Sequence, residues 1–151
     1  MSLERDIELL SGIPLFSDLS GDQLRLIAFS SARRDLGAGQ HLFLKGDPAL
    51  SAFVVASGAI GLSTPLAPDA IETCGTGQMI GELALFVESK RRVTATAKEP
   101  SGVVEITRQL MRRMLTEYPD LAAKLHARLS DRLLGTVGEL QRVQERLQTI
   151  R

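Results

Sequence analysis

The sequence predicts a mainly β fold, a barrel or a jelly roll, with helices before and after it. Two observations support this prediction. Short apolar runs recur through the middle of the chain between turns rich in Gly, Pro and Asp, a spacing typical of barrels and jelly rolls. At both ends of the chain, apolar residues instead recur at the spacing of amphipathic helices.

Two short helices are expected within residues 1–36. Apolar residues recur at helical spacing from Leu3 to Leu10, and Gly12 and Pro14 end this helix. A capping-box sequence at residues 20–23 predicts the start of a second helix. The second helix is expected to run through Leu24, Ile27 and Phe29.

The middle of the chain is expected to form six short strands. Turn residues separate the runs, and the stretch 65–69 is interpreted as a loop between two of them. The expected strands are 40–44, 52–56, 59–63, 71–74, 93–97 and 103–106.

One stretch, residues 77–97, combines the features that a sugar phosphate requires of a protein. Gly81 permits a positive φ, and the good helix formers after it would aim free N–H groups at an anion. Arg91 carries a guanidinium suited to a two-pronged grip on phosphate oxygens. The carboxylate of Glu82 is then available for neutral hydroxyl groups, so ribose and phosphate together are the expected ligand groups.

Residues 81–85 (GELAL), followed by Arg91 and a Thr/Ala strand, resemble the phosphate-binding cassette of cyclic nucleotide-binding domains. This family includes the effector domains of catabolite activator proteins and domains of cyclic nucleotide-dependent kinases and gated channels. Glycines at Gly46 and Gly58 lie where the family has strand turns, so the resemblance covers roughly residues 10–130.

The resemblance implies both the fold and the ligand contacts. Glu82 would accept a hydrogen bond from the ribose 2′-hydroxyl, Arg91 would pair with the cyclic phosphate, and the backbone N–H groups of Leu83 and Ala84 would complete the cradle. The ligand would be cyclic AMP or cyclic GMP, with cyclic AMP as the default. The implied fold is a double-stranded β-helix (jelly roll) in a single domain over 1–151: N-terminal helices at 1–36, the β-roll at 37–106 with the cassette at 77–97, and C-terminal helices at 107–151.

The chain departs from the family pattern at Arg92 and Val93, where the family has small residues. The alternation of a strand places Arg91 on an otherwise apolar face with Val93, which suits the wall of a pocket. Arg92 shares its face with threonines, so it is expected to point outward or to act as a second cation on the phosphate.

The C-terminal region is expected to form two helices. Thr107 can cap the first, and Tyr118 before Pro119 ends it. In the final helix a heptad seam of Leu133, Leu140 and Leu147 alternates with a second series at Leu129, Thr136, Val143 and Ile150. This seam favours a homodimer, and the alternative is that the helix docks on its own β-roll. Gly135 and Gly138 would weaken the helix or mark a hinge.

Composition narrows the function. The 151 residues carry zero formal net charge, which argues against a general nucleic-acid binder, and no apolar run is long enough for a membrane span. The charged N-terminus does not resemble a signal peptide, so a cytoplasmic location is expected. Cys74 is the single cysteine, and His41 and His126 lie far apart in the sequence, so neither a disulfide nor a metal centre is expected. No nucleophile or Walker-type motif occurs, so the protein is not expected to be an enzyme.

Two functions remain open. The first is a cyclic nucleotide sensor that signals through its final helix to an unknown protein partner or across a dimer, in signalling or transcriptional regulation. The region 124–132 of that helix is expected to contact the base. Catabolite activator proteins carry a C-terminal helix-turn-helix domain, and this sequence stops at Arg151 before such a domain could fit. Direct DNA binding by this chain is therefore not expected, unless the sequence is a fragment of a longer protein. The alternative is a degenerate pocket on a dimeric interaction scaffold, which the departures at Arg92 and Val93 favour.

Overall fold

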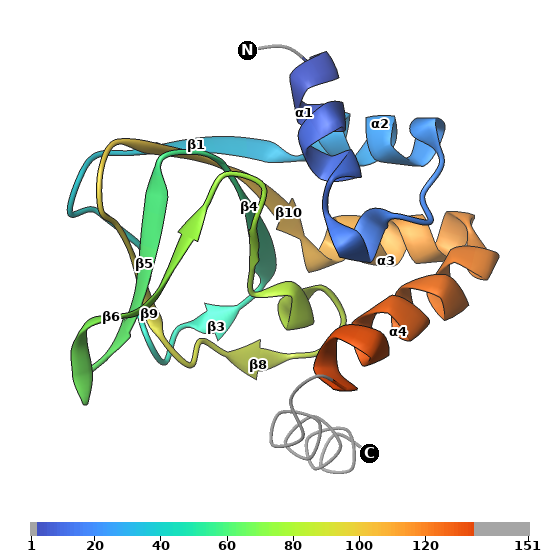
Figure 1. Cartoon of the computed structure of the whole chain (residues 1–151). Coiled ribbons are helices and arrows are strands. Elements are labelled where there is room, and N and C mark those ends of the chain that lie inside the picture. The colour runs from blue at the N-terminus through green and yellow to red at the C-terminus, as the bar shows by residue number, and fades with distance from the viewer. Residues whose placement is uncertain (1–2, 135–151) are drawn as a thin grey trace.

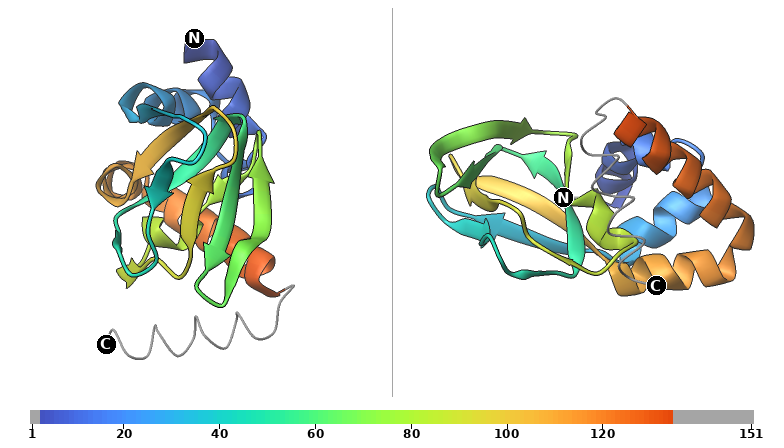
Figure 2. Two further views of the ribbon diagram at one scale, coloured as in Figure 1. Left: turned by 90° about the vertical axis from the view of Figure 1, so that its left-hand side faces the viewer. Right: turned by 90° about the horizontal axis from the view of Figure 1, so that it is seen from below.

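A computed structural model describes residues 3–134 and places an antiparallel β-roll beside a group of helices (Figure 1). The helices come from both ends of the described chain and lie together at one end of the roll (Figure 2). The α-helices are α1 (Leu3–Ser11), α2 (Gly21–Ser30), α3 (Arg108–Glu117) and α4 (Pro119–Leu134), and two 3₁₀ turns are η1 (Pro14–Phe16) and η2 (Glu82–Leu85).

Two four-stranded sheets face each other in the roll. The first sheet has the order β1-β10-β4-β7 and the second β2-β9-β5-β6, and all pairings are antiparallel. A short ladder joins β3 to β8. The strands are β1 (Ala32–Leu36), β2 (His41–Phe43), β3 (Pro48–Ala49), β4 (Ser51–Ser57), β5 (Ala59–Thr64), β6 (Ala67–Gly75), β7 (Met79–Ile80), β8 (Ser89–Lys90), β9 (Thr94–Ala97) and β10 (Ser101–Thr107). The jelly-roll class with flanking helices is thereby confirmed.

Strand β4 separates two hydrophobic cores. Phe53 and Val55 point into the roll and pack with residues of the opposite sheet, such as Ile60. Ala52 and Val54 point the other way and pack against the helices. Because side chains alternate along a strand, the apolar run of β4 contributes to both cores at once. The neighbouring strand β10 alternates in the same way, with Val103 in the core of the roll and Val104 and Ile106 against the helices, so these two strands join the helices to the roll.

Local signals at the helix ends are confirmed. Ser20 and Gln23 form both hydrogen bonds of a capping box at the start of α2. The Thr107 hydroxyl accepts a hydrogen bond from the N–H of Leu110 at the start of α3. The break between α3 and α4 falls at Tyr118, as expected for the residue before a proline.

Several element boundaries differ from the sequence prediction. Strand β1 lies within residues 1–36, a range assigned to helices, because charged Arg33 and Arg34 hide the strand pattern while pairing with β10 supplies the stabilisation. The two-residue strands β3, β7 and β8 are too short to show any periodicity. The expected loop 65–69 is mostly strand, since β6 already begins at Ala67 after a turn at Pro65 and Leu66. In α2, Phe29 is 77% exposed and does not join the core.

The structure describes only part of the final helix. Leu129, the first residue of the expected heptad seam, is buried in the core between the helices and the roll of its own chain. The seam positions after residue 134 and the glycines Gly135 and Gly138 lie outside the described residues. The expected dimer therefore stays a prediction. Within residues 3–134, none of the helices is long and apolar enough for a bilayer crossing.

Candidate functional site

A cavity of about 360 Å³ opens beside η2, at the junction of the two sheets. Its volume falls within the range of about 300 to 1,000 Å³ found for small-molecule sites. All six residues singled out in the sequence line it: Gly81, Glu82, Leu83, Ala84, Arg91 and Arg92. The remaining lining is mainly apolar and includes Phe43, Leu62 and Ile80 from three different strands. The fold thus brings the predicted charged residues to one apolar-walled cavity.

Gly81 begins the 3₁₀ turn and lies directly against the guanidinium of Arg91. Its backbone is left-handed, with φ 75° and ψ 33°. A Cβ atom at this position would lie 2.6 Å from Nη1 of Arg91, closer than any ordinary contact. Glycine is therefore needed here for two reasons, the backbone conformation and the space that the arginine occupies.

Substituting Gly81 by alanine is expected to weaken ligand binding by about tenfold or more, the factor that 1.4 kcal/mol represents. The added methyl group would displace the Arg91 guanidinium from its position. The matched control is Gly77→Ala, because Gly77 also has a positive φ but a Cβ there would meet no atom within 4 Å. Both variants should lose a similar amount of stability in thermal unfolding. Calorimetric titration with cyclic AMP, the ligand that the resemblance of the cassette implies, should show a loss of affinity for the Gly81 variant alone, and equal affinities would contradict this account.

Arg91 is held at the cavity by one hydrogen bond and by contacts with two aromatic rings. It is only 7% exposed, and its Nη2 donates a hydrogen bond of 2.7 Å to the carbonyl oxygen of Ser51. The guanidinium carbon lies 4.3 Å from the ring centroid of Phe43 and 5.5 Å from that of Phe53, within the range of cation–π contacts. Its Nε is buried and has no hydrogen-bond acceptor among the residues 3–134.

The charge of Arg91 is affected by opposing influences. Burial lowers the pKa of its guanidinium below the ordinary value, while the carboxylates of Glu105 and Asp47 raise it. An arginine pKa lies so far above neutrality that the side chain stays protonated at pH 7. The cavity therefore contains a fixed, partly desolvated positive charge, which favours an anionic ligand.

The main chain of Arg91 is fixed by the turn that contains Gly46. The N–H of Arg91 donates to the carbonyl of Asp47 at 2.7 Å, and the N–H of Gly46 donates to the carbonyl of Arg91 at 2.8 Å. The Asp47 carboxylate caps the same turn by accepting from the N–H of Leu44. This turn, noticed in the sequence only for its glycine, thus places the arginine at the cavity.

The turn η2 corrects one expectation about the backbone cradle. The N–H of Ala84 donates to the carbonyl of Gly81 at 3.0 Å, because a 3₁₀ turn closes with i→i+3 hydrogen bonds. That amide is therefore already engaged, in contrast to the open donor expected there. The N–H of Leu83 donates to no backbone acceptor within the described part of the chain. Glu82 is half-buried, and its Oε2 is enclosed by protein atoms.

Arg91 and Arg92 face different environments. Arg91 is buried, as are Ala95 and Ala97 further along the same segment, whereas Arg92 is exposed. This pattern agrees with the strand alternation that assigned Arg91 to the cavity wall. Arg92 nevertheless contributes to the lining of the cavity at its rim, which leaves its role as a second cation a prediction.

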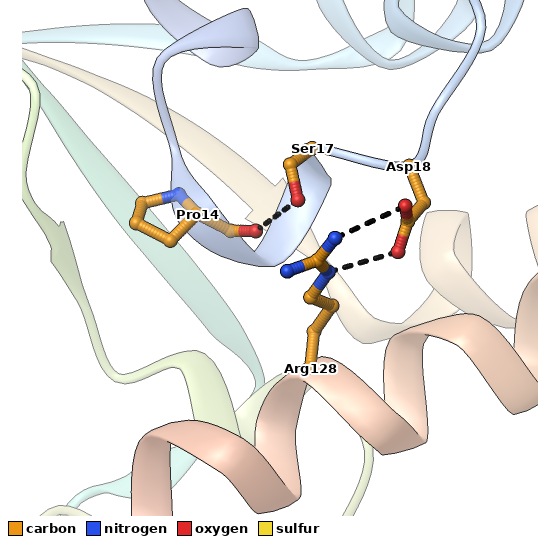
Figure 3. A network of polar contacts seen from close by, with 4 residues as sticks. All are labelled: Pro14, Ser17, Asp18 and Arg128. Atoms are coloured by element: carbon orange, nitrogen blue, oxygen red, sulfur yellow. Dashed lines mark hydrogen bonds and ion pairs between the residues drawn. The ribbon is translucent and has the colours of Figure 1, made fainter.

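Helix α4 connects the cavity side of the molecule to the N-terminal segment. The ring of His126 lies 5.9 Å from that of Phe86, the residue that follows η2. Further along the helix, Arg128 forms two hydrogen bonds to the carboxylate of Asp18, of 2.9 and 3.2 Å (Figure 3). In Figure 3 the guanidinium and the carboxylate face each other across the gap between α4 and the segment after η1.

The ion pair between Asp18 and Arg128 should make stability depend on pH. The hydrogen bond from Arg128 lowers the pKa of Asp18 in the folded protein. The stabilisation by this group is therefore present above the ordinary aspartate pKa of about 4 and is lost as the pH falls through the lowered value. Asp18→Asn should lower the thermal unfolding temperature slightly at pH 7 and leave it unchanged near pH 2. Arg128→Gln should behave in the same way, and a difference that persists in acid would rule out this origin.

Among residues 3–134 no group of three or more His, Cys, Asp or Glu side chains is placed to hold a metal ion. Cys74 is buried at the cavity wall, and burial raises the pKa of its thiol. His41, which contacts Thr96, lies on β2, and His126 lies on α4. The buried cation among mainly apolar walls gives the cavity the chemistry that suits a small anionic molecule.

These features define a ligand-binding domain built on a β-roll. A family model described as the cyclic nucleotide-binding domain matches residues 33–118, and the chain belongs to this family.

The comparisons also identify related proteins. The cyclic AMP receptor protein of Thermus thermophilus is 29% identical over 127 residues, which cover 82% of this chain and 59% of the receptor. A putative potassium channel protein of Rhodopseudomonas palustris is 24% identical, with 78% of this chain and 29% of the channel protein covered. The chain thus spans less than two thirds of these relatives.

Solved structures support the same assignment. The N-terminal domain of a transcriptional regulator from Streptomyces coelicolor superposes with a TM-score of 0.77 at 27% identity and covers 87% of this chain and 94% of that domain. The sensor domain of the transcriptional regulator DNR from Pseudomonas aeruginosa has a TM-score of 0.74 at 28% identity, with 91% and 94% covered.

Proposed function

We propose that this chain is a regulatory sensor domain that binds cyclic AMP in the cavity beside η2. The observation that supports this most is the buried Arg91, which lines the cavity beside Gly81 and Glu82 in the order of the phosphate-binding cassette. The choice of cyclic AMP over cyclic GMP follows the named ligand of the receptor protein to which the chain is similar.

In the proposed complex, the cyclic phosphate lies against the guanidinium of Arg91. A phosphate oxygen would supply the acceptor that the buried Nε lacks within residues 3–134. A buried donor without an acceptor costs about 1 to 3 kcal/mol, so the ligand would gain from satisfying it. The N–H of Leu83 would donate to the same phosphate, and Glu82 would accept a hydrogen bond from the ribose 2′-hydroxyl. Arg92 at the rim would add a second, solvent-exposed positive charge.

The output of the sensor is proposed to pass through α4. Phe86 directly follows the cassette turn and contacts His126 on this helix. Arg128, two residues further on, ties the helix to Asp18. A ligand can shift α4 only by binding one arrangement of these contacts more strongly than another. The shift would be passed to a protein partner or across a homodimer, in signalling or transcriptional regulation, with no bond chemistry by this chain.

Calorimetric titration of the full chain with cyclic AMP, and separately with cyclic GMP, tests this proposal. We expect saturable binding of one cyclic AMP per chain, with cyclic GMP weaker. Absence of binding to both nucleotides by correctly folded protein would reject the sensor and favour the scaffold function, in which the cavity has no ligand.

A further inference from the structure

Two successive hydrogen bonds link Arg91 to the half-buried side chain of Glu105. Nη2 of Arg91 donates to the carbonyl oxygen of Ser51 at 2.7 Å. The hydroxyl of Ser51 in turn donates to Oε2 of Glu105 at 2.7 Å. Ser51 is only 3% exposed, and neither it nor Glu105 is among the residues that line the cavity.

Glu105 occupies an unusual place for a carboxylate. On β10, Val103 points into the roll and Val104 and Ile106 pack toward the helices. The alternation of the strand therefore directs Glu105 inward, opposite Phe53 of β4. A carboxylate on such a face is costly unless it is hydrogen-bonded or compensated by a positive charge. Here the Ser51 hydroxyl supplies the hydrogen bond, and Arg91 is the positive charge whose pKa this carboxylate raises.

The segment that receives Arg91 is also held from its other side. Three consecutive carbonyl groups accept hydrogen bonds from arginine residues. Ala49 accepts from the side chain of Arg108 at 2.9 Å, Leu50 from the main-chain N–H of Arg108 at 3.0 Å, and Ser51 from Arg91. The carbonyl group that accepts from Arg91 thus belongs to a segment, residues 49–51, that is fixed by hydrogen bonds from Arg108 as well. The Ser51 hydroxyl links this segment to the carboxylate of Glu105.

We propose that Ser51 and Glu105 are positioning residues for Arg91, which hold its guanidinium at the cavity through the Ser51 carbonyl without touching the ligand. The inference deepens the proposed function and rests on it for the identity of the ligand. The direction in which ligand affinity changes on removal of Glu105 distinguishes a positioning role from a purely electrostatic one. A carboxylate that acted only through its charge would repel an anionic ligand, so its removal would tighten binding, whereas removal of a positioning residue weakens it.

The test compares four variants of the full chain by calorimetry with cyclic AMP. Ser51→Ala and Glu105→Ala each break the hydrogen-bond chain and should weaken binding about 3- to 10-fold. Glu105→Gln keeps an acceptor for the Ser51 hydroxyl and should bind within about threefold of the original chain. Ser57→Ala is the control, because the Ser57 hydroxyl also joins β4 to β10, by accepting from the N–H of Gly102 at 3.1 Å, but has no contact with Arg91.

A second readout needs no ligand. The Nε–H of Arg91 is buried, so its exchange with water is slow and its NMR resonance should be observable. The resonance should broaden or shift in Ser51→Ala and Glu105→Ala and stay unchanged in Glu105→Gln and Ser57→Ala. The proposal is overturned if the two alanine variants leave this resonance and the affinity unchanged, or if Ser57→Ala has the same effect. Failure of every form to bind nucleotide, with the resonance changing as expected, would reject the sensor function and keep the positioning role.

Discussion

Arg91→Ala is expected to weaken cyclic AMP binding by about 2 to 5 kcal/mol, the usual effect of removing one partner of a buried, hydrogen-bonded charge pair. Arg91 is 7% exposed, and its side chain meets the carbonyl of Ser51 and the ring of Phe43. No other type of side chain offers a positively charged, planar group that can donate two parallel hydrogen bonds. Titration calorimetry measures the difference directly.

Two further variants separate charge from geometry at the same site. Arg91→Lys keeps the positive charge but loses the fork of donors, so its affinity should fall between those of the original chain and the alanine variant. Arg92→Ala removes an exposed cation and should cost less than about 1 kcal/mol. If Arg92→Ala lost more affinity than Arg91→Ala, the ligand contact would belong to Arg92.

Phe16→Ala should lower the free energy of unfolding by about 3 to 5 kcal/mol, the range measured for large aromatic side chains in protein cores. Phe16 is 1% exposed at the end of η1 and packs in the core between the helices and the outer face of the first sheet. Its loss would leave a cavity beneath α4, because Leu125 and Leu129 belong to the same core.

Phe29→Ala is the matched control for the loss of an aromatic ring. Phe29 is 77% exposed on α2, so its removal should change the free energy of unfolding by no more than about 0.5 kcal/mol. Chemical denaturation of both variants measures the two changes on one scale. Comparable losses for Phe16 and Phe29 would show that Phe29 is covered in solution by a partner or by a second chain.

Features determined by local chemistry were predictable from the sequence. The capping box at Ser20, the break before Pro119 and the left-handed turn at Gly81 each depend on a few neighbouring residues. The cassette lies within one continuous stretch, so its residues were expected to meet at one site, and they do line one cavity. The binding of a nucleotide there stays a prediction.

Features determined by distant partners were not predictable. Strand β1 has charged residues in its middle, and it is a strand because β10 pairs with it, with Ala32 opposite Glu105. No local sequence pattern reports a partner so far along the chain. The acceptor and the aromatic rings around Arg91 come from Ser51, Phe43 and Phe53, far away in sequence. The tight closure of η2, which engages the Ala84 amide, depends on a choice between 3₁₀ and α geometry that helix propensity does not distinguish.

The hydrogen bonds from Arg108 and Arg91 to the carbonyl groups of residues 49–51 make Leu50 a suitable position for a fluorescent label. Leu50 is 63% exposed, and the peptides on either side of it are held by Arg108 at the start of α3 and by Arg91 at the cavity. Cys74 is the single native thiol and is buried, with its pKa raised. A thiol-reactive dye would therefore label the Leu50→Cys variant selectively at position 50. The emission of the dye would follow any rearrangement between the cavity and the helical end of the molecule.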